Sequence, residues 1–190
     1  MAPRHHGAMR HVGPSRAELG VRTIFNILGP LSNPAGVKRQ LTGAFSRAWI
    51  KPMAAVLGRL GCERAWVVHG SDGLDELTTT GPSYVAEWHK GRVRTFKVSP
   101  KDAGIARANP VLLKGGDADV NASAIREMLD GKSGPLRDVV VFNSAAALVV
   151  AGKAKNLKQG AALAAASIDQ GRAKAALESL VRISNLNVPA

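Results

Sequence analysis

The chain has 190 residues, of which 45% are hydrophobic and 4% aromatic, and its formal net charge is +12. This length supports one core, and the single cysteine, Cys62, excludes an internal disulfide and suits a reducing compartment. No leader and no apolar run of the roughly 20 residues that span a bilayer is found, so we expect a cytoplasmic protein without membrane contact.

The first half of the chain predicts helices and tight turns, followed by strands. Residues 1–35 are expected to be helical, with turn signals at Gly29-Pro30 and Asn33-Pro34. Apolar residues at helical spacing predict a helix over 51–60 that ends at Gly61. The apolar run 65–68 predicts a buried strand, and alternation around Lys90-Gly91 predicts a hairpin of 84–88 with 93–98.

The second half is mostly helical in its patterning. It predicts a helix over 121–129, preceded by a turn and an N-cap at 115–119, and then a buried strand over 139–142. Further helices are expected over 144–151, 159–168 and 174–181, the last two separated by Gly171. Helices that alternate with short buried strands indicate an α/β fold, here with an antiparallel hairpin added.

Chemistry-bearing residues are densest at 67–76, which read Val-Val-His-Gly-Ser-Asp-Gly-Leu-Asp-Glu. A predicted strand ends there in a glycine turn, and ligands of open α/β sheets bind beyond the carboxyl ends of strands. Adjacent carboxylates in an irregular turn, such as Asp75 and Glu76, can face one Mg²⁺ ion. The alternative is a solvated acidic turn in which Asp72 caps the next helix, and spacing alone favours this second interpretation.

Three histidines near the start, His5, His6 and His11, raise the question of a zinc site. Their spacing does not match a helical i, i+4 pair, and no cysteine lies near them. Surface or pocket imidazoles are therefore the favoured interpretation.

Two segments closely resemble anthranilate phosphoribosyltransferases. The first is the opening, with Met-Arg-His-Val at 9–12, Arg16, and Arg-Thr-Ile-Phe-Asn-Ile-Leu-Gly-Pro-Leu-Ser-Asn-Pro-Ala at 22–35. The second is Gly-Leu-Asp-Glu at 73–76. Weaker similarity at 38–40, 67–70 and 143–148 extends the resemblance through essentially the whole chain.

The resemblance implies a fold and a domain plan. It implies an α/β fold that is the C-terminal part of a nucleoside phosphorylase/phosphoribosyltransferase-type, helix-covered mixed sheet. Residues 1–190 would form a single, partial α/β domain, in which 1–35 are a helical hinge and acceptor-site segment.

The resemblance also implies roles for particular residues. Asp75 and Glu76 match the magnesium-binding acidic pair, which reverses the preference drawn from spacing. Arg16 matches the arginine that holds the carboxylate of anthranilate, and a guanidinium can do so through two charge-assisted hydrogen bonds. Four further residues resemble the lining and closing turn of the acceptor pocket: His6, Met9, Gly29 and Pro30.

The implied activity is transfer of 5-phosphoribose from phosphoribosyl pyrophosphate to the amine of anthranilate, with Mg²⁺, in tryptophan biosynthesis. The family's N-terminal helices, which build its homodimer interface, and its Gly-Thr-Gly-Gly-Asp loop for the pyrophosphate have no counterpart in 1–190. We therefore expect the isolated chain to be poorly active.

Two alternatives stay open. A pyrimidine-nucleoside phosphorylase shares the general fold, but the Arg16 motif and the 73–76 turn argue against it. A catalytically inactive relative that binds nucleic acid would suit the net charge of +12. Few aromatic residues and cations spaced singly, concentrated in 1–51 and 151–190, argue against nucleic acid as the partner.

Overall fold

The computed structural model describes residues 11, 13, 18–21 and 23–186. Two short 3-10 helices, η1 (Pro100–Ala103) and η2 (Pro110–Leu113), follow the last strand. The helices and strands are, in chain order, α3 (Phe25–Leu31), β1 (Arg39–Gly43), α4 (Arg47–Arg59), β2 (Arg64–Gly70), β3 (Ser83–His89), β4 (Arg92–Val98), α5 (Ala118–Leu129), α6 (Pro135–Val150), α7 (Leu157–Asp169) and α8 (Arg172–Ser184).

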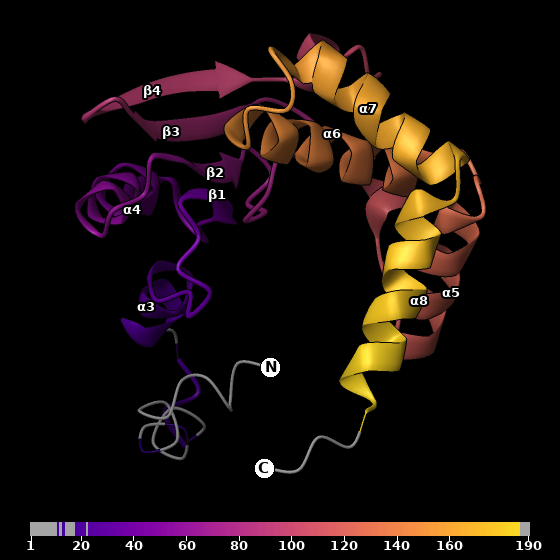
Figure 1. Ribbon diagram of the computed structural model, residues 1–190, viewed down its shortest axis with the longest axis horizontal. Helices are drawn as coiled ribbons and strands as arrows, with labels where there is room; N and C mark the ends of the chain where they lie inside the picture. Colours follow the sequence, from indigo (N-terminus) through magenta and orange to yellow (C-terminus); the bar gives the residue numbers. More distant parts are fainter. Residues whose placement is uncertain (1–10, 12, 14–17, 22, 187–190) are drawn as a thin grey trace.

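The four strands form one mixed sheet in the order β1-β2-β3-β4. The β1 and β2 strands are parallel and are joined through α4, whereas β2, β3 and β4 are antiparallel neighbours. Helices α4 and α6 lie on opposite faces of the sheet, and α7 packs on α6 (Figure 1). The expected helix-covered mixed sheet with an added hairpin is thereby confirmed.

Helix α4 covers one face because its apolar residues recur at helical spacing. Ile50, Met53 and Leu57 are buried against β2 and β3. The helix begins after Ser46, whose hydroxyl accepts a hydrogen bond from the backbone of the first turn, and the chain turns out of it at Gly61, where φ is +93°. The helix predicted over 51–60 is confirmed and begins one turn earlier.

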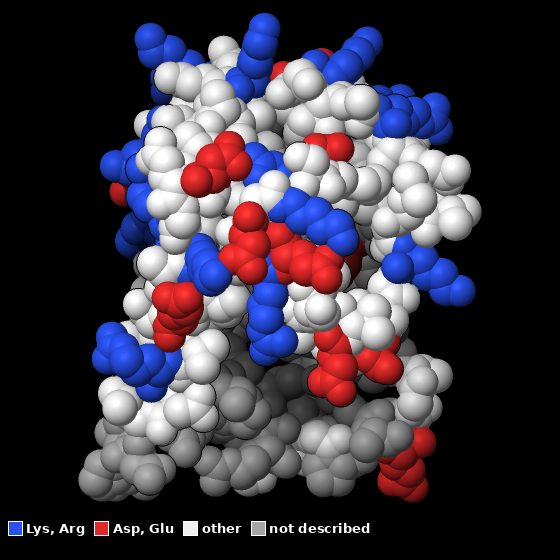
Figure 2. All heavy atoms as spheres, turned by 90° about the vertical axis from the view of Figure 1, so that its right-hand side faces the viewer, with Lys and Arg blue, Asp and Glu red and all other residues white. Residues whose placement is uncertain are grey.

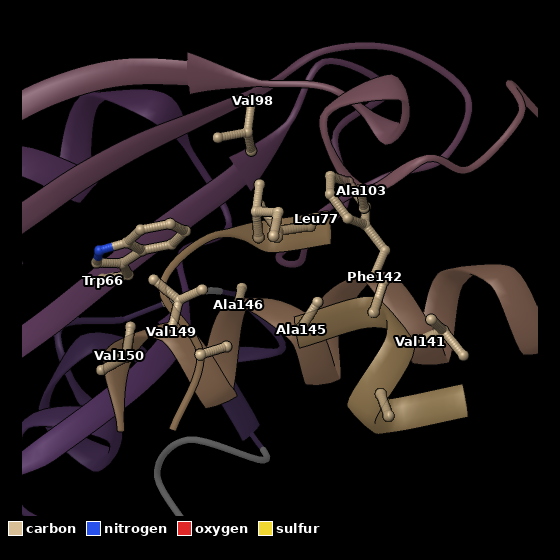
Figure 3. Close-up of a cluster of buried hydrophobic side chains, with 14 of the residues drawn as sticks. Trp66, Leu77, Val98, Ala103, Val141, Phe142, Ala145, Ala146, Val149 and Val150 are labelled. Carbon is tan, nitrogen blue, oxygen red and sulfur yellow. The ribbon is translucent and has the colours of Figure 1, made fainter. Parts of the chain in front are cut away.

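The main core lies between the other face of the sheet and α6 (Figure 3). Trp66 and Val98 come from the strands and Leu77 from the loop after β2, and they face buried side chains of α6. Phe142, on α6, is fully buried. On the far side of α6, a side chain at Gly160 of α7 would meet the carbonyl oxygen of Ala145 at 2.7 Å, so this glycine allows the two helices to approach closely.

The structure contradicts the strand predicted over 139–142. These residues belong to α6, which starts at Pro135 and continues through the helix predicted over 144–151. Both faces of α6 are buried, so Val139, Val141 and Phe142 form an apolar run that imitates a buried strand.

Two other local predictions also change. The turn predicted at Gly29-Pro30 is wrong, because both residues lie inside α3. Strand β1 was not predicted at all, since no residue of this short strand is fully buried. The turn at Asn33, strand 65–68, the hairpin around Lys90-Gly91 and the three helices over 121–129, 159–168 and 174–181 are confirmed within a few residues.

One buried carboxylate, that of Glu87 on β3, joins the sheet to α6. Its oxygens accept hydrogen bonds from Arg64 Nε and Trp66 Nε1, each at 2.9 Å, and from Arg94 Nη2 at 2.7 Å. Arg64 also donates to the carbonyl oxygen of Val149 in the last turn of α6 at 2.7 Å. Burial alone would raise the pKa of Glu87, but the hydrogen bonds from the indole and the two guanidinium groups outweigh it and lower that pKa.

Within the described residues, no helix combines the length and the apolar character that crossing a membrane requires.

We expect Glu87→Gln to lower the free energy of unfolding at pH 7 by about 1.5–3 kcal/mol, because hydrogen bonds to a charged group are lost. The pKa of Glu87 is depressed in the folded state, so its stabilisation exists above the ordinary carboxyl pKa and disappears as the pH falls through the folded value. Urea unfolding at pH 7 and pH 3 measures both effects.

Glu63→Gln is the matched control for this change. Glu63 is 61% exposed and pairs with Arg39 at 3.3 Å, so its loss should cost less than about 1 kcal/mol. Equal losses for the two variants would contradict the assigned importance of Glu87.

Candidate functional site

The candidate site is the loop 71–82, which leaves the end of β2 and returns as β3. The carboxyl ends of the parallel strands β1 and β2 meet at this edge of the sheet. The loop begins with a tight turn in which the backbone N–H of Gly70 donates to the carbonyl of Leu74 at 2.8 Å and that of Gly73 donates to Gly70 at 3.1 Å. Gly73 has φ of +93°, which a residue without a side chain adopts readily.

Asp72 holds the loop together from within. Its carboxylate accepts hydrogen bonds from Thr78 Oγ1 at 2.5 Å, from Thr80 Oγ1 at 2.7 Å and from the backbone N–H of Leu74 at 3.3 Å. Desolvation alone would raise the pKa of Asp72, but these hydrogen bonds lower it overall. The alternative that Asp72 caps a following helix is wrong, because the loop continues into a strand.

The second half of the loop is a buried anchor. Thr78 and Thr79 are fully buried, and Thr80 is nearly so. The N–H of Ala108 donates to the carbonyl of Thr79 at 2.9 Å, and Arg107 Nε donates to that of Thr80 at 2.5 Å. The anchor fixes one side of the loop and leaves the acidic residues on its exposed side.

Asp75 and Glu76 are exposed neighbours on that side. The pKa of Glu76 is raised, first by partial desolvation and then by the negative charges of Asp75 and Asp72. The carbonyl oxygen of Asp75 lies so close to Gly43 that a side chain there would meet it at 1.6 Å. Gly43 therefore allows the acidic segment to lie over the end of β1.

The donor set of this segment fits a hard divalent cation. Carboxylate oxygens are ligands that Mg²⁺ prefers, and a cation would relieve the repulsion between the neighbouring carboxylates, which adds to partial desolvation in raising the pKa of Glu76. In the part of the chain that the structure describes, no group of three or more His, Cys, Asp or Glu side chains could hold a metal ion. Asp75 and Glu76 would thus need further oxygen ligands, such as water or substrate phosphates.

A hydrogen bond between His69 and the backbone fixes the connection from β1 to α4, which starts beside the loop. The imidazole Nδ1 of His69 lies 2.8 Å from the carbonyl oxygen of Ala44, just after β1. A carbonyl only accepts, so Nδ1 carries the hydrogen and donates it. This bond joins the end of β2 to the start of the β1–α4 connection.

Asn143 of α6 also holds the loop, a role that was not predicted from the sequence. Its Nδ2 donates to the carbonyl of Leu77 at 2.8 Å, and its Oδ1 accepts from the N–H of Leu77 at 2.9 Å. The signal in the sequence was an amide residue directly after the apolar run 139–142, because a half-buried polar side chain needs a partner.

The other predicted site residues lie either in α3 or outside the described residues. Gly29 and Pro30 lie in α3, and the carbonyl of Pro30 accepts a hydrogen bond from Gln40 Nε2 of β1 at 2.8 Å. The predictions for His6, Met9 and Arg16 fall outside the described residues. Asp75 and Glu76 are thus exposed on the loop after β2, and both the metal-site and the acceptor-site assignments stay predictions.

Charges of both signs mix on the face that includes α5 and α8 (Figure 2). Acidic side chains gather in the middle of this face, with Lys and Arg among and around them. Lys174 Nζ lies 2.5 Å from Asp130 Oδ1, and Lys132 Nζ lies 2.6 Å from Glu127 Oε2. The positive charge forms no continuous stripe on this face.

Comparison with known families gives one extensive match. The family described as "Glycosyl transferase family, a/b domain" matches residues 1–174. An anthranilate phosphoribosyltransferase of Bradyrhizobium diazoefficiens is 60% identical over 184 residues, which are 97% of this chain and 55% of that protein.

Solved structures agree with this match. Anthranilate phosphoribosyltransferase from Thermus thermophilus has a TM-score of 0.85 at 47% identity, over 93% of this chain and 52% of its own. The Saccharomyces cerevisiae protein of the same name, in complex with PRPP and Mg, has a TM-score of 0.83 at 30% identity, over 95% and 53%. The chain thus spans about half the length of the relatives it matches.

We expect Glu76→Gln to stabilise the fold at pH 7 when divalent cations are absent. The raised pKa means that the folded state disfavours the charged form, so Glu76 reduces stability as the pH rises through the ordinary carboxyl pKa. The gain should stay below about 1 kcal/mol because the side chain is exposed, and it should vanish at pH 3, where both states are protonated.

Thermal unfolding of both forms at the two pH values tests this prediction. Glu127→Gln is the control, because Glu127 is paired with Lys132 and its neutralisation should not stabilise the fold. A destabilised Glu76→Gln variant at pH 7 would contradict the repulsion argument.

Proposed function

The chain belongs to the glycosyl transferase family that this a/b domain represents, and we propose that it serves the transfer of 5-phosphoribose from phosphoribosyl pyrophosphate to the amine of anthranilate. The observation that carries the proposal is the pair of exposed carboxylates, Asp75 and Glu76, on an anchored loop at the carboxyl edge of the parallel strands. The name shared by relatives of about 60% identity supports the choice of substrates.

Asp75 and Glu76 would hold Mg²⁺ in this reaction. The ion supplies charge neutralisation for the departing pyrophosphate. The loop contributes by keeping the two carboxylates exposed and adjacent, while Asp72 directs its own charge inward to the hydroxyl groups of Thr78 and Thr80. The carboxylates are the cation ligands, and Asp72 supports the loop on which they lie.

The acceptor would be held by the opening segment. We assign to Arg16 the binding of the anthranilate carboxylate, because a guanidinium can bind a carboxylate through two parallel hydrogen bonds. His6 and Met9 would line the pocket around the aromatic ring, with Gly29 and Pro30 at its closing side. The hydrogen bond from Gln40 to Pro30 supports this arrangement, because it ties α3 to the strand whose carboxyl end lies beneath the acidic loop.

The bond changes follow from the two substrates. The anthranilate nitrogen forms a bond to the anomeric carbon of the ribose, the bond from that carbon to the pyrophosphate oxygen breaks, and the nitrogen releases a proton. Positive charge develops on the ribose and negative charge on the leaving group. Positioning of the two substrates and stabilisation of the departing charge are therefore what the site must provide.

We expect the combined change Asp75→Asn with Glu76→Gln to reduce turnover in the complete enzyme at least about 100-fold, because charge stabilisation of the leaving group is lost. Loss of anthranilate fluorescence in the presence of phosphoribosyl pyrophosphate and Mg²⁺ measures the rate. Glu127→Gln with Asp130→Asn removes two paired surface carboxylates, one in α5 and one at its C-terminal cap, and should leave the rate unchanged.

The same assay separates the proposal from its alternative. Unchanged turnover and unchanged Mg²⁺ dependence in the Asp75/Glu76 variant would refute the metal assignment. Tight, salt-sensitive binding of single-stranded DNA without consumption of anthranilate would refute the enzyme proposal and favour a nucleic-acid-binding module.

Arg16→Lys should raise the KM for anthranilate about tenfold or more, because an ammonium group cannot reproduce the two-bond geometry. The KM for phosphoribosyl pyrophosphate should stay the same. Arg182→Lys, a like substitution on the exposed face of α8, is the control. A changed KM for the donor with an unchanged KM for anthranilate would overturn the assignment.

A further inference from the structure

Asn143 makes a two-way hydrogen-bonded clamp between α6 and the acidic loop. Its side-chain amide donates to the carbonyl and accepts from the N–H of Leu77, at 2.8 and 2.9 Å. The same Nδ2 also donates to the carbonyl of Val139 within α6, at 3.0 Å. Both polar ends of the amide are thus engaged, which fixes the orientation of the side chain on the helix.

The clamp acts at the residue that immediately follows Glu76. Leu77 is fully buried, so water cannot replace Asn143 as the hydrogen-bond partner of its backbone. At the other end of the acidic segment, the backbone of Leu74 is held twice, by the carboxylate of Asp72 and by the N–H of Gly70. Only Asp75 and Glu76 lie between these two fixed points.

Such an arrangement matters because the two carboxylates repel each other. Asp75 and Glu76 are adjacent acids on the exposed part of one loop, so a loop free to rearrange would move their like charges apart. With Leu74 and Leu77 fixed, the segment cannot relax in this way without breaking buried hydrogen bonds, each of which is costly to leave unpaired.

We propose that Asn143 is a positioning residue for the Asp75–Glu76 cation site, acting through the backbone of Leu77. This inference rests on the proposed function, in which the two carboxylates hold a divalent ion. Asn143 itself contacts neither carboxylate in the bonds described, and its role is to fix where the chain enters the buried anchor after Glu76. It is thus comparable to the outer residues that orient the ligands of metal sites.

The test is a titration of the protein with Mn²⁺ alone, followed by the electron paramagnetic resonance signal of the free ion. We expect Asn143→Ala to weaken Mn²⁺ binding about tenfold, in line with the loss of an outer residue at a metal site. Asn143→Asp keeps the acceptor for the N–H of Leu77 but turns a carboxylate oxygen towards the carbonyl oxygens of Leu77 and Val139, so it should not restore the binding.

The chain offers a matched control in α5. Asn121 makes the same two-way clamp on Gly116, accepting from its N–H at 3.0 Å and donating to its carbonyl at 2.9 Å. Asn121→Ala removes an equivalent pair of bonds away from the acidic loop and should leave Mn²⁺ affinity unchanged. Val150→Ala, at a buried position of α6, controls for lower stability of the helix itself.

The outcomes separate this inference from the proposed function. If Asp75→Asn with Glu76→Gln abolishes Mn²⁺ binding but Asn143→Ala leaves it intact, the carboxylates hold the ion and the positioning role is refuted. If the double variant binds Mn²⁺ as tightly as the unchanged protein does, the metal assignment fails and the inference fails with it. An equal loss in Val150→Ala would also refute it, because stability would then explain the effect.

Discussion

The candidate site depends on a loop that carries three carboxylates within five residues and still keeps one shape. Asp72 makes this possible because its negative charge is directed inward, onto two threonine hydroxyl groups and a backbone N–H. The same loop therefore lowers the pKa of Asp72 and raises that of Glu76. One acid stabilises the loop, and Asp75 and Glu76 stay crowded and exposed, which is the electrostatic condition that favours a divalent cation.

Helix α6 supports this loop, and hydrogen bonds fix the helix at two places along its length. Near the carboxyl edge, Asn143 holds the backbone of Leu77. At the C-terminal end of the helix, Arg64 donates to the carbonyl of Val149 and Arg39 to that of Ala151, each at 2.7 Å. Cationic groups at a helix C-terminus also interact favourably with the helix dipole. The helix is thus held in register with the sheet, and its buried faces leave little freedom for it to shift.

How much of this was predictable depends on the kind of signal that each element leaves. Helix α4 was located correctly because its apolar residues recur at helical spacing along one buried face, and the β3–β4 hairpin was located from the alternating residues around Lys90-Gly91. The run 139–142 was misread as a strand, because both faces of α6 are covered and periodicity then carries no information. Strand β1 was missed for the opposite reason, since its short sequence is only partly buried.

The site itself was predictable only in its exposed part. Adjacent acids after a strand and a glycine turn identified Asp75 and Glu76 as candidates, and both residues are exposed in the structure. The supports of the loop left weaker signals, because their partners are distant in the chain or belong to the backbone. Asn143 lies 66 residues from Leu77 in the sequence. Gly43 matters because the backbone of Asp75 packs against it. Such roles follow from packing rather than from spacing.

The charge of the loop constrains how the proposed donor approaches it. The chain as a whole carries +12, yet the three carboxylates of this loop are all negative and a bare pyrophosphate would be repelled by them. In the proposed reaction, phosphoribosyl pyrophosphate therefore meets Asp75 and Glu76 as its magnesium complex rather than as a free anion. The remaining positive contacts to its phosphates must come from groups outside the acidic segment, and the relatives, about twice as long as this chain, have room for them.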